Sequence, residues 1–271
     1  MIFEEIEGVP RFECVEFENK KKDYCLCIPV INEGERILSE LKKAKELNVS
    51  QYVDIIICDG NSTDGSINYE KLKSFNVNTL LIKKDIGKQG AQLRMGFFWC
   101  LKRGYKGIVT IDGNNKDSIE NVQNFVEKLK EGYDFIQGSR FINGGHGINT
   151  PFERLVAIRL IHAPIISITA RHIFTDTTNG FRGYSANYLL HPRVQPFRDI
   201  FMSYELLAYL SVKASQLNLK VCEVPVTRMY PINEKTPTKI SGFSGQLELF
   251  TILMKNLLGY YNVKKGEKNG V

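Results

Sequence analysis

The chain has 271 residues, of which 43% are hydrophobic and 24% are charged, and its formal net charge is +6. This length and composition are typical of a globular protein with one large domain, or one domain and a small appendage. The sequence contains no run of 18 apolar residues and begins with acidic rather than basic residues. We therefore predict no membrane-spanning segment and no export signal, and we expect the protein in the cytoplasm.

The cysteines and the net charge exclude some further classes of function. Six cysteines are scattered through apolar runs without the paired spacing of a zinc site, so we interpret them as buried, reduced thiols. The positive charge suits an anionic ligand or an acidic membrane surface, and equally an ordinary soluble surface. Nucleic acid is not an expected partner, because the aromatic residues lie in apolar runs and not between basic residues.

Residues 1–22 mix acidic and aromatic residues and precede the first clear strand pattern. We interpret them as an N-terminal extension packed on the domain surface. The first predicted strand, residues 24–30, leads into a helical pattern that begins at Asn32 and Glu33. The second, residues 53–58, is followed by Asp59 and a run of small and polar residues. A loop of that composition can approach a ligand closely, and Asp59 could accept hydrogen bonds from a ribose or a base.

A third predicted strand, residues 79–82, is followed by a glycine-bearing loop that contains Lys88. The loop opens a helix, so Lys88 is a candidate phosphate contact at a helix N-terminus, although the spacing is not that of a P-loop.

The fourth predicted strand, residues 108–111, ends at Asp112. A carboxylate with oxygen ligands two or more residues further on can hold Mg²⁺ or Mn²⁺ against a diphosphate. The alternative interpretation is a simple strand-to-helix turn, in which Asp117 or Ser118 caps the helix that begins near Ile119.

Strands and helices alternate from residue 24 to residue 138. This alternation predicts an α/β fold with a parallel sheet and helices on both faces. Right-handed crossovers would then bring the loops described above to the same edge of the sheet.

Polar residues with possible roles continue in the second half. Arg140 follows a predicted strand and is a candidate phosphate or substrate contact, while Asp176 and Arg182 lie in a polar segment too compact for a linker. Glu205 lies in the first turn of a predicted helix. There it is either stabilised by the helix dipole or placed to act as a general base.

Four further segments of the sequence can be interpreted. Residues 152–170 form a long apolar helix, either in the core or with an outward face for a lipid or a partner. Residues 230–243 resemble a lid loop. An apolar helix at residues 247–258 packs in the core or lies on a membrane surface, and a flexible basic tail follows at residues 261–271.

The sequence resembles the family 2 glycosyltransferases, and is most similar to their dolichol-phosphate mannosyltransferase-like branch. The resemblance rests on the order and spacing of several motifs: PVINE at 29–33, DGNSTDG at 59–65, GKQGAQLRMGF at 87–97, the strand ending in Asp112, GSRF at 138–141, NGFRGYS at 179–185, SYELLAY at 203–209, and KVCEVPV followed by TPTKISG.

The resemblance implies a GT-A fold, which is Rossmann-like with a mostly parallel sheet, in a single domain at residues 23–260. Its nucleotide-binding half would span about 23–140 and its acceptor half about 141–260. It also implies a nucleotide-diphosphate sugar donor and inversion at the anomeric carbon. The residues that would bind the donor are Pro29, Asn32, Glu33, Asp59, Lys88, Lys116, Arg140, Arg182 and Lys239.

Asp112 matches the first acid of the family's metal-binding DxD motif, but Asn114 occupies the position of the second acid. An amide oxygen still coordinates Mg²⁺ or Mn²⁺, yet the site loses one negative charge, and the Lys116 ammonium opposes the metal further. Our hypothesis is that metal binding requires the donor's diphosphate, and that Lys116 neutralises part of the leaving-group charge.

The acceptor determines whether a general base is needed. A polyprenyl phosphate is already an anion, whereas a glycan hydroxyl must lose its proton as it attacks. For a hydroxyl we assign the base to Glu205, with Asp176 positioning the acceptor or the Arg182 loop. Two other functions stay open: a sugar-phosphate nucleotidyltransferase, and a nucleotide-binding protein without catalytic activity.

Overall fold

The computed structural model describes residues 2–3, 7–231 and 242–263. Within them, nine strands form one sheet in the order β1-β2-β5-β4-β3-β6-β9-β7-β10, and β11 and β8 pair separately. The strands are β1 (Ile2–Phe3), β2 (Phe12–Glu16), β3 (Tyr24–Val30), β4 (Asp54–Asp59), β5 (Val77–Lys83), β6 (Gly107–Thr110), β7 (Phe135–Ser139), β8 (His146–Ile148), β9 (Arg182–Ser185), β10 (Val221–Pro225) and β11 (Thr227–Met229).

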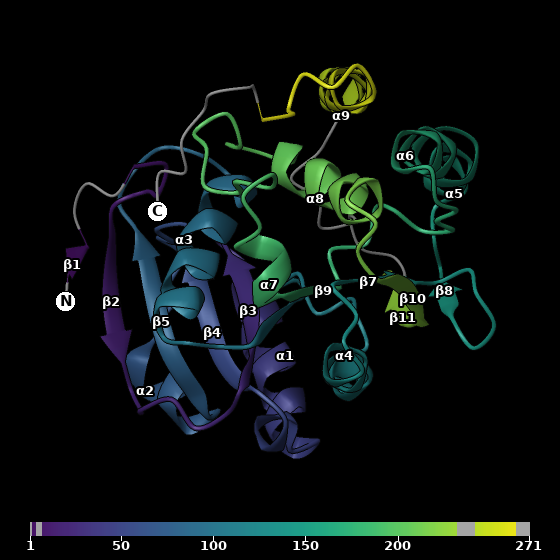
Figure 1. The fold of residues 1–271 in the computed structure, drawn as a ribbon. Coiled ribbons are helices and arrows are strands. Elements are labelled where there is room, and N and C mark those ends of the chain that lie inside the picture. Colours follow the sequence, from purple (N-terminus) through teal and green to yellow (C-terminus); the bar gives the residue numbers. More distant parts are fainter. Residues whose placement is uncertain (1, 4–6, 232–241, 264–271) are drawn as a thin grey trace.

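Helices cover both faces of this sheet (Figure 1). Helices α1, α2 and α4 pack on one face, and α3 and α8 cover the other, with α6 and α9 packed beyond α8. The helices are α1 (Glu35–Glu46), α2 (Tyr69–Ser74), α3 (Gln89–Lys102), α4 (Val122–Lys130), α5 (Phe152–Ala157), the π-helical turn η3 (Ile158–His162), α6 (Ala163–Ala170), α7 (Ala186–Leu189), α8 (Glu205–Gln216) and α9 (Gly242–Leu257).

The predicted alternation of strands and helices is confirmed. Strands β5, β4, β3 and β6 run parallel to one another, so their carboxyl ends open at the same edge. Strand β9 is inserted antiparallel between β6 and β7, which makes the sheet mostly and not wholly parallel. Pro225 is the last residue of β10, the strand at the other edge of the sheet. Proline has no backbone N–H group, but an edge strand has no further strand to which that group would donate a hydrogen bond.

The two hydrophobic clusters follow from the sequence pattern. In α1 the apolar residues Ile37, Leu38, Leu41 and Ala44 recur at helical spacing and are buried against the sheet. On the same face Phe125 of α4 stacks on Phe181, with ring centroids 4.2 Å apart. The six cysteines are all free thiols, five of them buried, as predicted.

The segment before residue 22 contributes a strand to the sheet. Strand β2 pairs antiparallel with β5, and Phe12 is fully buried, with its ring edge-on to that of Phe98 in α3. At the other end, Tyr261 packs on Phe201, whereas residues 264–271 of the predicted tail lie outside the described residues. Among the described helices, none combines the length and apolar composition needed to cross a bilayer.

The burial of Phe12 gives a test of whether the first segment is part of the fold. We expect Phe12→Ala to lower the free energy of unfolding by about 3–5 kcal/mol, because it leaves a cavity between β2 and α3. Phe152→Ala is the matched control, since the Phe152 side chain is 78% exposed and its loss should cost less than about 0.5 kcal/mol. Equal denaturant midpoints for the two variants would show that β2 adds no stability.

Candidate active site

The loops after β3 and β4 are joined to each other at the carboxyl edge of the sheet. The Asn32 side chain accepts a hydrogen bond from the Thr63 amide at 2.8 Å, and the Ser62 hydroxyl accepts one from the Asn32 amide at 3.0 Å. Behind them, the Gln92 side chain of α3 donates to the carbonyls of Val30 and Cys58, the penultimate residue of β4. The predicted nucleoside-binding residues of the first two loops therefore form one connected rim.

Asp59 ends β4 beneath this rim and is 2% exposed. Its carboxylate accepts hydrogen bonds from the amides of Asn61 and Ser62 and from the Ser62 hydroxyl. Burial raises the pKa of Asp59, and these hydrogen bonds offset part of that rise. Nearby, Glu33 is nearly buried and pairs with Arg36 at 2.9 Å.

Asp112 lies where four separate chain segments meet. Its carboxylate accepts a hydrogen bond from Gln89, at the start of α3, at 3.1 Å, and pairs with Arg228 of β11 at 3.0 Å. Gly180 approaches so closely that a β-carbon there would fall 2.4 Å from the Asp112 Oδ1 atom. A larger residue at position 180 would therefore displace the Asp112 carboxylate, because the backbone of the NGFRGYS segment lies directly against it.

Arg228 is the main site residue that the sequence analysis missed. It is 5% exposed, and its guanidinium donates to the carboxylates of both Asp112 and Asp117. These partners lie 116 and 111 residues away in the sequence, so no local pattern indicates the contact. Asp117, which the alternative interpretation offered with Ser118 as a helix cap, is buried in this ion pair.

The charges of this cluster shift one another's pKa values. Burial alone would raise the pKa of Asp112, but Arg228 and Lys116 hold it below its ordinary value, so the carboxylate is ionised at neutral pH. Burial and the neighbouring Arg228 lower the pKa of Lys116 to about 8. Burial raises the pKa of Asp117, with Arg228 opposing the rise.

Glu40 of α1 supports the Asp112 loop from below and was also missed. The residue is fully buried, and its carboxylate accepts the amide hydrogen of Asn115 at 3.1 Å. Asn115 has a φ of 55°, a left-handed conformation that asparagine tolerates better than most residues. Burial raises the pKa of Glu40 well above its ordinary value, which favours a neutral acid under the loop.

Asp112 and Asn114 fit a hard divalent cation as ligands. They share one tight turn, in which the Asn114 amide donates to the Asp112 carbonyl at 2.8 Å. The Asn114 Oδ1 atom is buried, and within the described part of the chain it has no hydrogen-bond partner, as expected of an oxygen kept for another ligand. One carboxylate and one amide carry less charge than two carboxylates, and Arg228 and Lys116 reduce the attraction further.

A second group of cations surrounds the Tyr230 side chain, next to Arg228. Tyr230 is 2% exposed, and its hydroxyl lies 3.3 Å from a guanidinium nitrogen of Arg140 and 3.3 Å from one of Arg154. The Lys116 ammonium lies 5.3 Å from the ring centroid. Although burial opposes the change, these arginines and Arg228 lower the pKa of Tyr230. We call Tyr230, Arg140, Arg154, Lys116 and Arg228 the cation cluster.

Arg140 and Asp176 form a buried ion pair. The Arg140 guanidinium donates to both oxygens of Asp176, at 2.6 and 2.9 Å, and both side chains are almost inaccessible to solvent. Asp176 is thus held at the border of the cation cluster, and the remaining nitrogen of Arg140 is directed to the Tyr230 hydroxyl.

The other predicted residues lie around this centre. The Arg182 guanidinium donates hydrogen bonds to the carbonyls of Thr177, Asn179 and Leu207. These bonds hold residues 177–179 next to helix α8. Glu205 accepts the Ser203 amide hydrogen at 2.5 Å in the first turn of α8.

Lys88 and Lys239 are the remaining residues that we predicted to bind the sugar donor. The Lys88 side chain is 64% exposed, 3.7 Å from Glu248 of α9. Lys239, with most of the predicted lid, lies outside the described residues.

Comparisons with known proteins identify the family of the chain. The sequence model described as Glycosyl transferase family 2 matches residues 25–190. The polyprenol monophosphomannose synthase of Mycolicibacterium smegmatis is 25% identical over 242 residues, which cover 88% of this chain and 89% of that protein. The undecaprenyl-phosphate mannosyltransferase of Micrococcus luteus is 26% identical over 219 residues, covering 79% and 86%.

Solved structures give the fold. The glucosyl-3-phosphoglycerate synthase of Mycobacterium tuberculosis superposes with a TM-score of 0.62 at 16% identity, over 87% of this chain and 80% of that one. The mannosyl-3-phosphoglycerate synthase of Rubrobacter xylanophilus gives a TM-score of 0.61 at 12% identity, over 86% and 72%. These likenesses confirm the GT-A fold predicted from the sequence.

The charge deficit at the metal ligands can be tested directly. We expect Asn114→Asp to raise the affinity of the nucleotide-free protein for Mn²⁺ about tenfold or more, because it adds a carboxylate at a ligand position. Asn115→Asp adds the same charge one residue away, at an exposed position, and should change the affinity much less. Titration calorimetry measures both, and equal affinities in the two variants would remove Asn114 from the ligand set.

Proposed function

The chain belongs to glycosyltransferase family 2, and on this basis we propose that it transfers a hexosyl group from a nucleotide-diphosphate sugar to the phosphate of a polyprenyl phosphate. Two relatives, each covered over most of its length, are a polyprenol monophosphomannose synthase and an undecaprenyl-phosphate mannosyltransferase. Family membership also favours sugar transfer over the nucleotidyltransferase and the inactive nucleotide-binding protein left open by the sequence.

The cation cluster is the observation that carries the choice of acceptor. Four cationic side chains gather around the buried Tyr230 ring and hydroxyl, which suits a site that receives anionic groups from both substrates. The two base candidates already accept hydrogen bonds: Asp176 from Arg140, and Glu205 from the Ser203 amide. This arrangement supports an acceptor that arrives as an anion and requires no deprotonation.

The proposed reaction is a single displacement. A phosphate oxygen of the acceptor attacks the anomeric carbon and forms a new carbon–oxygen bond, while the bond from that carbon to the donor's β-phosphate oxygen breaks. The configuration is inverted, and the nucleoside diphosphate leaves with the electron pair. Since the attacking phosphate is already ionised at neutral pH, no proton transfer to a base accompanies the attack.

Each part of the site has a task in this proposal. The rim containing Pro29, Asn32, Glu33 and Asp59 would hold the nucleoside. Lys116 and Arg228 would stabilise the charge that develops on the leaving diphosphate. Asp112 and Asn114 would hold Mg²⁺ or Mn²⁺, which when bound supplies further positive charge to the diphosphate.

The acceptor side of the site would be formed by Arg154, Arg140 and the Tyr230 hydroxyl. Arg140 is paired with Asp176, so we assign it a positioning task. We give the direct contact with the acceptor phosphate to Arg154, whose guanidinium reaches the Tyr230 hydroxyl from helix α5. Because polyprenyl phosphates are membrane lipids, the proposal also places the reaction at the cytoplasmic surface of a membrane.

Substitution of Arg154 separates the two substrates. We expect Arg154→Gln to raise the KM for the polyprenyl phosphate about tenfold or more, through loss of a charge-assisted contact, with little change in the KM for the nucleotide sugar. Arg103→Gln is the control, because Arg103 pairs with Glu16 on the opposite edge of the sheet. A radiolabelled transfer assay gives both constants, and a rise in the donor KM alone would contradict the assignment.

Glu205→Gln distinguishes a phosphate acceptor from a hydroxyl acceptor. With a polyprenyl phosphate we expect kcat to stay within about threefold of the native value, since no base is required. With a hydroxyl acceptor the loss should be about 100-fold or more. A loss of that size with the phosphate acceptor, at unchanged KM and unchanged thermal stability, would restore Glu205 as the base and refute the proposed chemistry.

A further inference from the structure

An exposed apolar stripe runs along α5, η3 and α6. Five apolar residues spaced four apart are all exposed: Phe152 (78%), Val156 (36%), Leu160 (72%), Pro164 and Ile168 (69%). In an uninterrupted α-helix of about 3.6 residues per turn, a four-residue spacing would wind gradually around the axis. The wider π-helical turn at 158–162 counteracts that rotation, so the stripe stays on one side.

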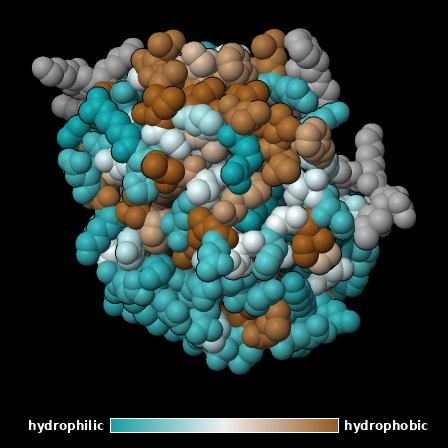
Figure 2. Space-filling model, turned by 90° about the vertical axis from the view of Figure 1, so that its right-hand side faces the viewer, coloured by the Kyte–Doolittle hydropathy of each residue, from teal (hydrophilic) through white to brown (hydrophobic). Residues whose placement is uncertain are grey.

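Helix α9 extends the stripe into a broader surface. Helix α9 packs against α6, and it exposes Leu247 (53%), Phe250 (44%), Leu257 (38%) and Leu258 (79%), the last just beyond the helix end. In Figure 2 hydrophobic surface gathers in the upper half of this side of the molecule, above a hydrophilic lower half. We call the exposed apolar residues of α5, η3, α6 and α9 the apolar face.

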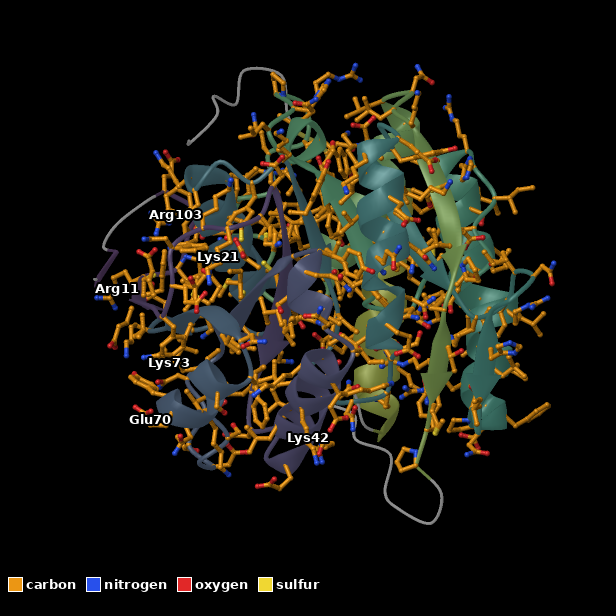
Figure 3. The ribbon with its side chains drawn as sticks, turned by 90° about the horizontal axis from the view of Figure 1, so that it is seen from below. Arg11, Lys21, Lys42, Glu70, Lys73 and Arg103 are labelled. Carbon is orange, nitrogen blue, oxygen red and sulfur yellow. The ribbon has the colours of Figure 1, made fainter. Side chains whose placement is uncertain are left out.

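The opposite side of the molecule differs in composition. Figure 3 shows Lys42 of α1 and Glu70 and Lys73 of α2 among the outward side chains there. Several charges on that side form ion pairs, such as Lys42 with Glu46 at 3.9 Å and Arg11 with Asp85 at 2.8 Å. Of the 18 large hydrophobic side chains that are exposed among the described residues, nine belong to the apolar face, and the others are distributed over the rest of the surface.

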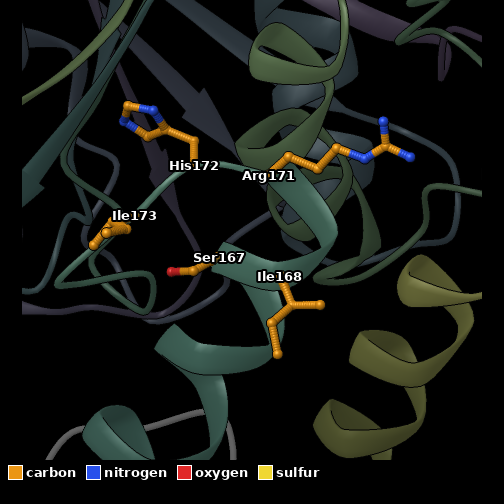
Figure 4. Close-up of a pocket in the computed structure, with 5 residues that line it drawn as sticks. All are labelled: Ser167, Ile168, Arg171, His172 and Ile173. Atoms are coloured by element: carbon orange, nitrogen blue, oxygen red, sulfur yellow. The ribbon is translucent and has the colours of Figure 1, made fainter.

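The charges that accompany the apolar face are mainly positive. Residues 151–175 contain three arginines and a single acidic residue, Glu153. Arg159 and Arg171 are exposed, and Figure 4 shows Arg171 beside Ile168 at the end of α6, with Ile173 (81% exposed) just beyond. An apolar surface accompanied by arginines fits the boundary between the acyl chains and the anionic headgroups of a bilayer.

Helix α5 joins this face to the proposed acceptor site. Arg154 points inward, where its guanidinium contacts Tyr230, whereas Phe152 and Val156, two residues to either side, are exposed. Residues two apart lie on different sides of a helix. A lipid whose chain stays in a bilayer against Phe152 and Val156 could thus present its phosphate to Arg154 across the width of one helix.

We propose that the apolar face docks on the surface of a bilayer containing anionic lipids, with α5, η3, α6 and α9 lying in its plane. The inference rests on the proposed function, in which the acceptor's headgroup must reach Arg154 while its chain remains in the membrane. The bound partner is the lipid surface itself, held by the apolar side chains and by Arg159 and Arg171.

Co-sedimentation with lipid vesicles tests the docking. The probe is vesicles of equal parts phosphatidylglycerol and phosphatidylcholine, and we expect Leu160→Gln/Ile168→Gln to lower the partition coefficient about tenfold or more. Leu47→Gln/Leu190→Gln is the matched control, because both side chains are exposed but lie off the apolar face. Equal partitioning of the two double variants would overturn the proposal.

The charge contribution is tested with the native protein. Partitioning should fall severalfold when phosphatidylglycerol is omitted or the salt concentration is raised. Binding unaffected by both changes would remove the arginines from the proposal. If light scattering shows a dimer that Leu160→Gln/Ile168→Gln dissociates, the face is a contact between copies of the chain, and the bilayer is excluded as its partner.

A transfer assay separates this inference from the proposed function. With a short-chain, water-dispersed polyprenyl phosphate, Leu160→Gln/Ile168→Gln should transfer sugar at the native rate. With a long-chain acceptor in vesicles, the transfer rate of this double variant should fall by the same factor as its partition coefficient. If the native protein binds vesicles through the face but transfers sugar to neither acceptor, the proposed function fails while the docking stands. Full activity of the variant on vesicles would contradict the docking.

Discussion

The structure of the site depends on one buried guanidinium. Arg228 lies between the carboxylates of Asp112 and Asp117 and connects β11, from the second half of the chain, to the end of β6 in the first half. Removing charges from water is costly, and the pairing recovers that cost only while each partner is present. The arginine therefore fixes where the Asp112 carboxylate points, and it supplies positive charge beside that carboxylate.

The charge distribution around Arg228 connects the two substrates. Lys116 and Arg228 lie beside Asp112, while Arg140 and Arg154 meet at the Tyr230 hydroxyl, and the Tyr230 ring also lies 5.3 Å from the Lys116 ammonium. A donor diphosphate and an acceptor phosphate would otherwise repel each other at close range. In the proposed reaction, the positive groups around this one aromatic ring would allow two anions to approach the same sugar. The predicted weakness of the metal site follows from the same arrangement, because these cations reduce the attraction for Mg²⁺ or Mn²⁺.

The sequence predicted the parts of the site that depend on local pattern. Asp59 ends β4 and Asp112 lies two residues beyond β6, so their place at the carboxyl edge follows from the alternation of strands and helices. Contacts between distant segments were not predictable from the sequence. The contacts made by Arg228, by Glu40 and by Arg154 with Tyr230 join residues up to 116 positions apart, and none of them belongs to a short motif. Strand β2 was missed because Phe12 lies in a segment rich in charge. For residues 152–170 the sequence left a core helix and an outward apolar face open, and the exposure of Leu160 and Ile168 favours the second.

The most direct test of the account is the position of a bound metal and nucleotide. Crystals grown with Mn²⁺ and a nucleoside diphosphate would give the manganese position from its anomalous scattering. The account predicts a manganese peak bonded to the Asp112 carboxylate, with the diphosphate extending from it toward Lys116 and Arg228. A diphosphate bound elsewhere on the molecule, or a manganese peak remote from Asp112, would contradict it.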